Sequence, residues 1–406
     1  MKTAVSKSFS LIAIIIALCS TTIKAQTTTT QNGLTFELNN STKTATVTGY
    51  TDKTIKEIII PDAIIDNGIN YSVISIKECA FDHNDIITSV TIPETVSEIG
   101  EYTFYRCKSL TKVNIPNNVT NINQATFADC TSLQNIEIPN SVISIRPSAF
   151  FGCASLKSIA LPKSIQRIEL SAFYKCSGLT NIHIPENVNF IGTSAFPSNT
   201  IKSITVDNRN KTYDSRENCN AIIETASNKL IIGSNYSSIP KSITALGDAA
   251  FMKCSELKVI TLPENLTHIG GSALYGCSGL TEINSLNPIP PTFGPYNFTI
   301  TTNLYETLPI FVPYGSLNAY QKADEWKNFK NIHERQFGNV DKIENQRIKI
   351  TTTNGIIHIT GANVKAVEVI DINGKIIYKG NETKIKAPNG IYIIHVDNTV
   401  KRIIMQ

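Results

Sequence analysis

The sequence predicts a β-rich solenoid of about eight 23-residue repeats, followed by a small β-sandwich. Two observations predict this fold. Proline and phenylalanine recur at a spacing of 23 residues, at Pro93, Pro116, Pro139, Pro162 and Pro185 and at Phe81, Phe104, Phe127, Phe150, Phe173 and Phe196. Beyond residue 345 this period gives way to short alternating apolar segments separated by Asn-Gly pairs. A fixed short period indicates units that bury their apolar side chains by stacking on neighbouring units.

Residues 1–25 are expected to be a secretory signal peptide. Lys2 and Lys7 form a basic start, residues 9–18 are apolar, and the small residue Ala25 precedes the expected cleavage site. The apolar run is too short to span a bilayer. A lipoprotein signal that uses Cys19 is the disfavoured alternative, because the residue before this cysteine is not small. The protein is therefore expected to be secreted or held on the outer cell surface.

The next segments are expected to form a capped solenoid. Residues 26–54 are expected to form a β cap over the open end of the stack, because residues 34–50 alternate and are rich in threonine. Residues 55–290 carry the repeats, each with an L-x-x-[IV]-x-[IL]-P segment that predicts a strand ended by proline. A V-x-x-I segment then returns the chain along the other side of the coil. In the copy that begins at Leu133, Ile136 and Ile138 are the inward residues of the strand.

One repeat is longer than the others, and the chain changes after the last repeat. Pro185 and Pro240 are 55 residues apart, which predicts a lengthened repeat at about 207–239 with a hairpin in residues 221–232. Residues 291–335 are expected to cap the solenoid, with Trp326 in the core of the cap, and 336–345 to be a linker.

Residues 346–406 are expected to form the β-sandwich. About seven short strands fit in this segment. The pairs Asn354-Gly355, Asn373-Gly374 and Asn389-Gly390 predict tight hairpin turns, because Asn and Gly tolerate the positive φ angles that such turns require.

The repeat template, C-x-x-L-x-x-[IV]-x-[IL]-P-x-x-[VI]-x-x-I-x-x-x-A/T-F, resembles the BspA-like (Treponema-type) leucine-rich repeats of bacterial surface proteins. This resemblance implies a leucine-rich repeat right-handed solenoid and a role in binding, since relatives include adhesins. The end of the chain resembles the C-terminal sorting domain of the Bacteroidetes type IX secretion system, through Gly390, Tyr392, Ile394, Lys401 and Arg402. That resemblance implies contact with the secretion machinery, export, removal of the domain and surface attachment. An ordinary terminal β module is the alternative.

Six of the nine cysteines occupy one slot of the repeat, at Cys107, Cys130, Cys153, Cys176, Cys254 and Cys277. No C-x-x-C pair exists, so the usual zinc spacing is absent. Stacked equivalents would keep their Cβ atoms about 4.8 Å apart, beyond the usual disulfide range. The slot holds Asn84 in the first copy and Ser198 or Asn199 near the interruption. We therefore expect buried free thiols that pack the core and cap backbone groups of the loop.

No catalytic motif accompanies these repeats. The chain lacks a Gly-rich phosphate loop, a nucleophile elbow and a metalloprotease motif, so we expect no enzyme, no cofactor and no metal site. The net charge of +4 includes three leader lysines, so the mature chain is nearly neutral and offers no electrostatic case for binding nucleic acid. Membrane association is expected only through surface anchoring.

The remaining candidates lie on the surface of the solenoid. The outward positions of the predicted strands are Lys112, Asn114, Asn135, Glu137, Ser158, Asn181, His183 and Thr205. Tyr105, Phe151, Tyr174 and Tyr275, on the turn edge, form an alternative surface. We expect recognition of a host or bacterial surface protein or a glycan, in adhesion. A structural component of a surface matrix without a discrete ligand, and a non-catalytic partner of a surface hydrolase, are the alternatives.

Overall fold

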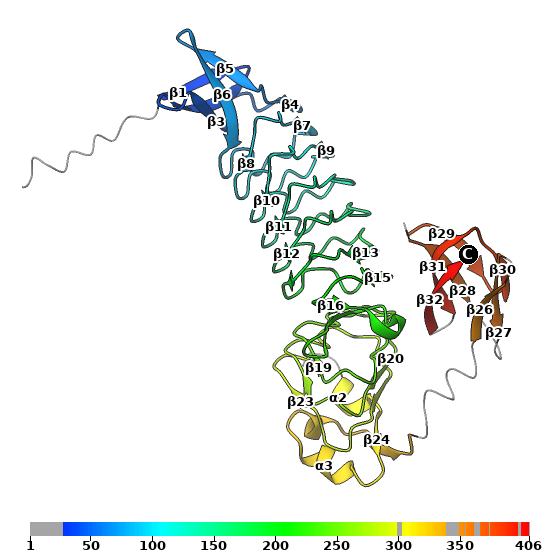
Figure 1. Cartoon of the computed structure of the whole chain (residues 1–406). Coiled ribbons are helices and arrows are strands. Elements are labelled where there is room, and N and C mark those ends of the chain that lie inside the picture. Colours follow the sequence, from blue (N-terminus) through cyan, green and yellow to red (C-terminus); the bar gives the residue numbers. More distant parts are fainter. Residues whose placement is uncertain are drawn as a thin grey trace, which may run out of the picture.

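The computed structural model describes residues 27–298, 303–337, 349–353, 355–360, 366–372, 374–396 and 399–405. The expected signal peptide and most of the expected linker lie outside these residues. The chain forms an elongated stack of coils with an antiparallel sheet at its N-terminal end, and a β module lies beside the middle of the stack (Figure 1). The stack has about 11 turns rather than eight, because the caps and the lengthened repeat add turns of their own.

The N-terminal sheet closes one end of the stack. Its antiparallel strands are β1 (Thr27–Gln31), β2 (Leu34–Asn39) and β3 (Thr44–Tyr50), and β3 pairs in parallel with β6 (Ile69–Ile76). β5 (Ala63–Asp66) pairs with β6 as a hairpin, and β8 (Glu98–Ile99) continues from β6 into the coils. Inward residues such as Phe36 and Val47 are fully buried, as the alternating sequence predicts.

Each coil carries two segments that pair with the equivalent segments of neighbouring coils. We call the outward side of the L-x-x-I-x-I segments the strand face and that of the V-x-x-I segments the return face. The strand face contains β4 (Glu57–Ile59), β7 (Ser89–Thr91), β9 (Lys112–Val113), β13 (Asn181–Ile184), β15 (Ser203–Val206), β20 (Val259–Leu262), β22 (Glu282–Ser285), β24 (Ile310–Pro313) and β25 (Ile332–Arg335). The return face contains β10 (Asn121–Ile122), β11 (Ser144–Ile145), β12 (Arg167–Ile168), β14 (Phe190–Ile191), β19 (Ala245–Leu246), β21 (His268–Ile269) and β23 (Thr292–Phe293).

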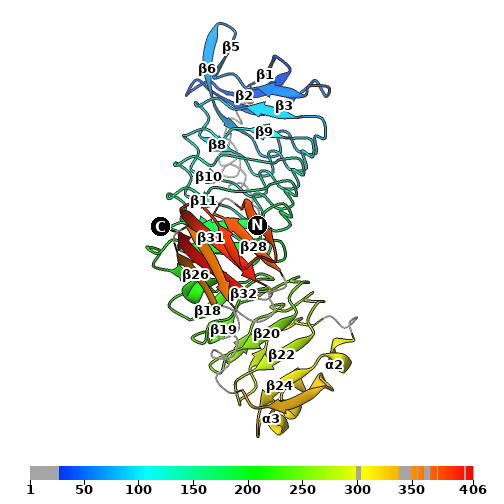
Figure 2. The ribbon, with the colours of Figure 1, turned by 90° about the vertical axis from the view of Figure 1, so that its right-hand side faces the viewer.

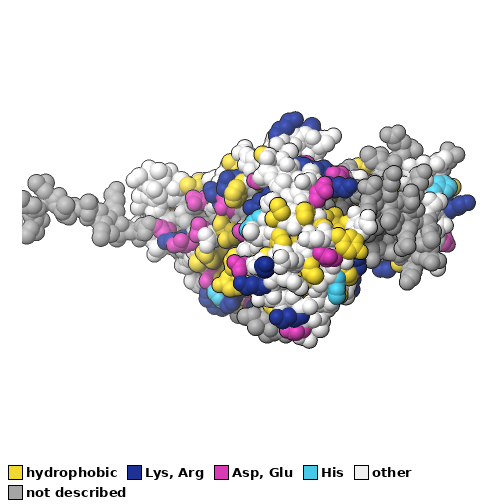
Figure 3. Space-filling model, turned by 90° about the horizontal axis from the view of Figure 1, so that it is seen from below, with side chains coloured by type: hydrophobic (Ala, Val, Ile, Leu, Met, Phe, Trp, Pro, Cys, Tyr) yellow, Lys and Arg dark blue, Asp and Glu magenta, His cyan; other side chains and the backbone are white. Residues whose placement is uncertain are grey.

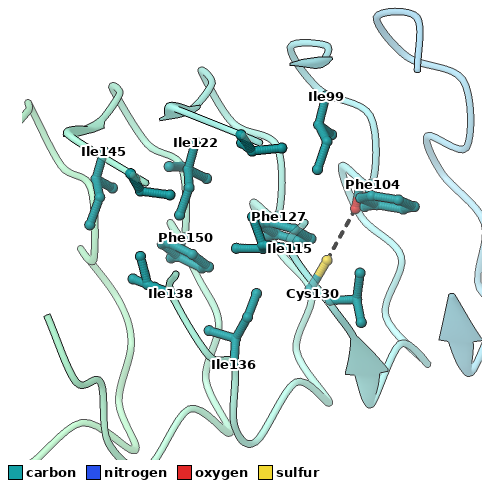
Figure 4. Close-up of a cluster of buried hydrophobic side chains, with 14 of the residues drawn as sticks. Ile99, Phe104, Ile115, Ile122, Phe127, Cys130, Ile136, Ile138, Ile145 and Phe150 are labelled. Carbon is teal, nitrogen blue, oxygen red and sulfur yellow. Dashed lines mark hydrogen bonds between the residues drawn. The ribbon is translucent and has the colours of Figure 1, made fainter. Parts of the chain in front are cut away.

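A column of phenylalanine rings runs through the core (Figure 4). The rings of neighbouring coils are nearly parallel, with centroids 5.2–5.5 Å apart from Phe81 to Phe196. Every ring in this run is at most 1% exposed. Isoleucines of the two segments, such as Ile136 and Ile145, close the core around the column. The 23-residue period therefore places one ring per coil, and each ring is buried only by its neighbours.

The lengthened repeat interrupts the return face. β17 (Ile222–Glu224) and β18 (Lys229–Ile232) form the antiparallel hairpin that the sequence predicts. β16 (Tyr213–Asp214) pairs with β17 but not with β14, so the return-face sheet is split at this point. The Tyr213 hydroxyl accepts a hydrogen bond from the Ile191 amide at 2.9 Å. This amide, on the edge strand β14, therefore has a partner although β14 and β16 do not pair. A short 3₁₀ helix, η1 (Arg216–Asn218), lies between β16 and β17.

The C-terminal end of the stack contains the described helices α2 (Leu304–Thr307), α3 (Leu317–Lys322) and the 3₁₀ helix η2 (Trp326–Asn328). Trp326 is fully buried here, which confirms its predicted place in the core. Its indole Nε1 donates a hydrogen bond to the Pro291 carbonyl at 2.7 Å.

Two sheets form the C-terminal module, as expected for a small β-sandwich. One consists of β26 (Lys349–Thr353), β27 (Ile356–Thr360) and β30 (Lys384–Lys386); the other consists of β29 (Ile376–Gly380), β28 (Val367–Asp371), β31 (Gly390–Val396) and β32 (Thr399–Met405). β26 and β27, and β28 and β29, pair as the predicted hairpins, and Gly355 and Gly374 between them have φ angles of 74° and 81°. Asn354 and Asn373 lie outside the described residues. The prediction for Asn389-Gly390 is wrong, because β30 and β31 belong to different sheets and this pair joins the sheets instead.

Candidate binding surface

Five of the eight predicted strand-face residues lie on the surface of successive coils. Lys112, Asn114, Asn135, Glu137 and Ser158 are exposed, whereas the residues that alternate with them are buried. This alternation follows from the period of two in an extended chain. Among the described residues neither Lys112 nor Glu137 has an ion-pair partner, so both charges remain available.

The strand face is not a continuous sheet. The sequence predicts a strand in every repeat, but residues 134–138 and 157–161 contain none. The backbone groups of residues 135–138 and 158–161 form no hydrogen bonds with other backbone groups. The same coils pair continuously on the return face, from β10 to β14, and share one core. That pairing holds the stack together without a ladder on the strand face, so donors and acceptors stay open there.

Asn181, His183 and Thr205, the other three predicted residues, lie on β13 and β15 beside the C-terminal module. The His183 Nδ1 and the Thr205 Oγ1 are 2.9 Å apart, within hydrogen-bond distance across the two strands. Thr205 lines a small cavity of about 40 Å³ together with Ile393 of the module. Asn181 lies against Gly374 of the module, and its Oδ1 is buried without a hydrogen-bond partner. The predicted set is therefore divided into an open part and a part beside the module.

The turn edge carries aromatic rings, as the alternative surface requires, but these rings are mostly engaged. Tyr105, Phe151 and Tyr174 are half-buried, and Tyr275 is exposed. Cations already cover three of the rings, with Arg106 at 5.2 Å from Tyr105, Lys175 at 4.9 Å from Phe151 and Lys253 at 5.6 Å from Tyr174. The turn edge is therefore less available to a partner than the strand face.

The repeat cysteines are donors within the core. Five of the six thiols point at the carbonyl of the phenylalanine in the preceding coil, as Cys130 does to Phe104 at an Sγ–O distance of 3.1 Å (Figure 4). Cys254, after the lengthened repeat, points instead at the Ser198 carbonyl at 3.6 Å. Burial raises the pKa of Cys107 to about 12, so this thiol stays protonated and unreactive. The six repeat cysteines are buried and free, as predicted. Cys219 is also buried and free, and Cys79 is free and exposed.

The polar residues that replace cysteine also satisfy backbone groups. The Asn84 Oδ1 accepts hydrogen bonds from the Ile86 and Ile87 amides at 2.8 and 2.9 Å. The Ser198 hydroxyl donates to the Ala250 carbonyl at 3.5 Å. The slot therefore selects a small polarisable or polar group near loop carbonyls and amides, not a metal ligand.

The described residues contain little that could support catalysis. No group of three or more His, Cys, Asp or Glu side chains is placed to hold a metal ion. A cleft of about 150 Å³ opens at the split in the return face, beside Glu224, Lys229 and Asp248. It is smaller than the roughly 300–1,000 Å³ that is typical of ligand pockets. No helix in the described part of the chain is long and apolar enough to cross a membrane.

Charges on the solenoid are paired between coils rather than gathered. Lys108 and Asp85 are 3.2 Å apart, and Arg146 and Glu169 are 3.3 Å apart, each pair joining two neighbouring coils. Such exposed pairs contribute about 0–1 kcal/mol each. The view from below, onto the end of the stack that carries α3, likewise shows acidic and basic side chains interspersed with hydrophobic and other side chains (Figure 3). A partner of one dominant charge is not favoured by this surface.

Comparison with known proteins now identifies the repeats. A family model described as the BspA type leucine rich repeat region (6 copies) matches residues 64–144, 98–223 and 230–310, which together exceed half of the chain. The chain belongs to this family. A second model, described as a domain of unknown function (DUF6383), matches residues 338–404 of this BspA-type protein. No curated protein is a significant match.

Solved structures of similar fold are bacterial repeat proteins. The pneumococcal vaccine antigen PcpA is 18% identical to this BspA-type chain, covers 77% of it and 99% of its own length, and has a TM-score of 0.55. A leucine rich cell surface protein from Faecalibacterium prausnitzii is 25% identical, with 76% and 95% coverage and a TM-score of 0.48. A leucine-rich repeat protein from Bacteroides ovatus is 20% identical, with 76% and 100% coverage and a TM-score of 0.34. None of these proteins is described as an enzyme.

Sequence reasoning missed one surface of this BspA-type protein, on β31 of the C-terminal module. The strand has the sequence GIYIIHV, and its residues from Tyr392 to Val396 are buried on both sides of the strand. Apolar residues at consecutive positions were the available signal, since a strand with one solvated side alternates. The resemblance to a sorting domain already accounted for the apolar residues of β31, so it gave no reason to expect burial on both sides of the strand.

Proposed function

We propose that this protein is a secreted or cell-surface binding protein that uses the open strand face for recognition of a protein or glycan, in adhesion. The observation that carries the proposal is the row of exposed side chains from Lys112 to Ser158 on successive coils. Stacked coils present such side chains at regular intervals on a rigid frame. The resemblance to a family that includes surface adhesins supports the same function.

The chemistry of this row favours a neutral, hydrogen-bonding partner. Lys112 and Glu137 supply opposite charges, and Asn135 supplies an amide donor and acceptor. The Asn114 side chain is itself fixed, because its Nδ2 and Oδ1 bond the Ile92 carbonyl and amide at 2.7 and 2.8 Å. Nearby backbone groups without backbone partners add further donors and acceptors. Sugars and extended peptide surfaces both offer complementary groups.

Binding can be tested with the mature chain, residues 26–406, against extracellular matrix proteins, bacterial surface proteins and glycans. We expect saturable binding that weakens at least tenfold in the double variant Lys112→Ala with Glu137→Ala. The matched control is Lys322→Ala with Glu306→Ala, since both residues are exposed on the C-terminal cap. Equal loss in both double variants would contradict the assignment of the face. Self-assembly alone would favour a matrix component, and selective capture of a surface hydrolase would favour the partner role.

The C-terminal module is proposed to be the type IX sorting domain of a Bacteroidetes-like protein. In support, Gly390, Tyr392 and Ile394 lie on β31, and Lys401 and Arg402 lie on β32, the paired last strands of the chain. The proposed partner of this module is the secretion machinery, and cleavage after Ala25 removes the signal peptide. The mass of the surface-exposed protein tests this. Retention of residues 346–406 in every surface molecule would contradict removal of the domain.

A further inference from the structure

The C-terminal module has a core of its own and a second buried patch outside that core. Tyr392, Ile394 and Val396 of β31 point into the module core. The alternating residues Ile393 and His395 point the other way, yet they are only 6% and 7% exposed. Ile370 of β28, directly opposite Ile393 in the sheet, is 2% exposed and also lies outside the module core. The outer side of this sheet is therefore covered by another part of the chain.

The covering part is the solenoid at its lengthened repeat. Ile393 shares a small cavity with Thr205 of β15 and with Ser215 and Asn218, at the start and end of η1. The ring of His395 lies 4.7 Å from the ring of Tyr236, which follows β18. Figure 1 places the module beside β13 and β15, and Figure 2, which faces the same side of the molecule, shows the module in front of the middle of the stack.

Three solenoid residues in this contact, Ser215, Asn218 and Tyr236, lie within the lengthened repeat, at η1 and after β18. Thr205 and Asn181 lie on β15 and β13, just before it. Ordinary coils carry neither a 3₁₀ helix nor a hairpin at the equivalent position. The lengthened repeat thus adds a surface, formed by η1 and the segment with Tyr236, that the regular coils lack. We call this surface the platform.

The contact between the module and the solenoid also leaves buried polar atoms without hydrogen bonds. Within the residues that the structure describes, neither the buried His395 Nε2 nor the buried Asn181 Oδ1 has a hydrogen-bond partner. Both atoms lie at this contact, one on each side, since Asn181 packs against Gly374. A buried polar atom without a partner opposes burial, so separation of the two surfaces would restore solvation to both groups. Such an interface favours docking that can be reversed.

We propose that the lengthened repeat is a docking platform for the C-terminal module of the same chain, and that the docked module controls access to the Thr205 end of the strand face. In the intact chain the open row from Lys112 to Ser158 is available at all times. Asn181 and Thr205, which are half-buried beside the module, become available to a partner when the module leaves, whereas His183 is already exposed. This docking proposal depends on the proposed binding function in one respect, that the strand face is a binding face.

Access to Thr205 can be measured by thiol labelling without knowledge of any ligand. The reporter is Thr205→Cys in a Cys79→Ser background, because Cys79 is the exposed native cysteine and the others described are buried. We expect the reporter to react slowly with a maleimide in the intact chain. Ile393→Asp, which places a charge in the contact, should accelerate the reaction at least tenfold. A reporter at Asn114, on the open part of the face, should react quickly in every background.

Two further variants separate undocking from unfolding. Ile376→Asp introduces the same charge on the same module at a residue that is 46% exposed, and the rate should not change. Tyr236→Ala removes the solenoid partner of His395 without altering the module, and it should accelerate labelling as Ile393→Asp does. Rapid labelling at Thr205 in the intact chain, or no acceleration in both Ile393→Asp and Tyr236→Ala, would overturn the proposal. Either result would leave the test of partner binding unaffected.

Discussion

Replacement of Cys153 distinguishes a hydrogen-bond donor from an apolar filler at the repeat cysteine. The Cys153 side chain is fully buried, and its Sγ lies 3.1 Å from the Phe127 carbonyl oxygen. That oxygen also accepts the Cys130 amide at 3.2 Å, so loss of the thiol leaves it with one partner. Cys153→Ala therefore removes a hydrogen bond worth about 1 kcal/mol. The lost sulfur removes about 1 kcal/mol more of burial and packing.

Serine separates these two contributions. Cys153→Ser loses the sulfur but keeps a donor near the Phe127 carbonyl, so we expect it to cost about 1 kcal/mol, half the cost of alanine. If the slot were purely apolar, Cys153→Ser would be less stable than Cys153→Ala, because an unpaired buried hydroxyl costs roughly 1–3 kcal/mol. Val142→Thr provides that apolar reference, since Val142 is fully buried and the repeat keeps this position apolar.

The assay is guanidinium unfolding of the intact chain under reducing conditions, followed by far-ultraviolet circular dichroism. Midpoints are compared between variants whose transitions have the same slope, because a changed slope reports a changed unfolded state. The expected order of stability is wild type, then Cys153→Ser, then Cys153→Ala, with Val142→Thr destabilised. A serine variant less stable than the alanine variant would refute the donor role of the thiol.

Three further predictions concern the stack and the module. In native-state hydrogen exchange, the amide of Ile136 should exchange faster than that of Arg146, which donates to the Ile122 carbonyl at 2.9 Å; equal protection would contradict the open strand face. Phe150→Ala should cost about 3–5 kcal/mol in denaturant unfolding, and Phe151→Ala, at the half-buried next residue, much less; similar costs would contradict the ring column. Burial lowers the pKa of His395 to about 4, although the charge of Glu368 opposes this shift. The docked state should therefore be fully stable above about pH 6.5 and weaken as the pH falls towards 4, which small-angle scattering would show. His395→Gln should remove this pH dependence.

The repeat positions were predictable because one physical requirement recurs in every coil. Phe150 and Cys153 reappear at a constant spacing, and each copy must bury the same groups against its neighbours. The hairpin from Ile222 to Ile232 was predictable for a similar reason, since its two apolar runs and turn are local. Patterns that depend on neighbouring residues are visible in a single sequence.

The features that were missed depend on contacts between distant segments. The absence of a strand at residues 134–138 follows from how the coils pair on the opposite face, which the segment itself does not encode. The Asn389-Gly390 pair has hairpin chemistry but joins two sheets, because β30 finds its partner in β27. The second buried side of β31 required knowledge of the solenoid surface beside it. For the same reason, the division of the eight strand-face residues was not predictable.

The split of the return face at Tyr213 lies between the open strand face and the C-terminal end of the stack. The length of the open face and the distance from the platform to the linker can therefore change separately. Insertion of a 23-residue coil before Pro185 would add one row to the open face and leave η1 and Tyr236 in place. Insertion after Pro240 would instead move the start of the linker away from the platform and leave the open face unaltered. The reach of the recognition surface and the tether of the terminal module are thus independently adjustable by duplication of whole coils.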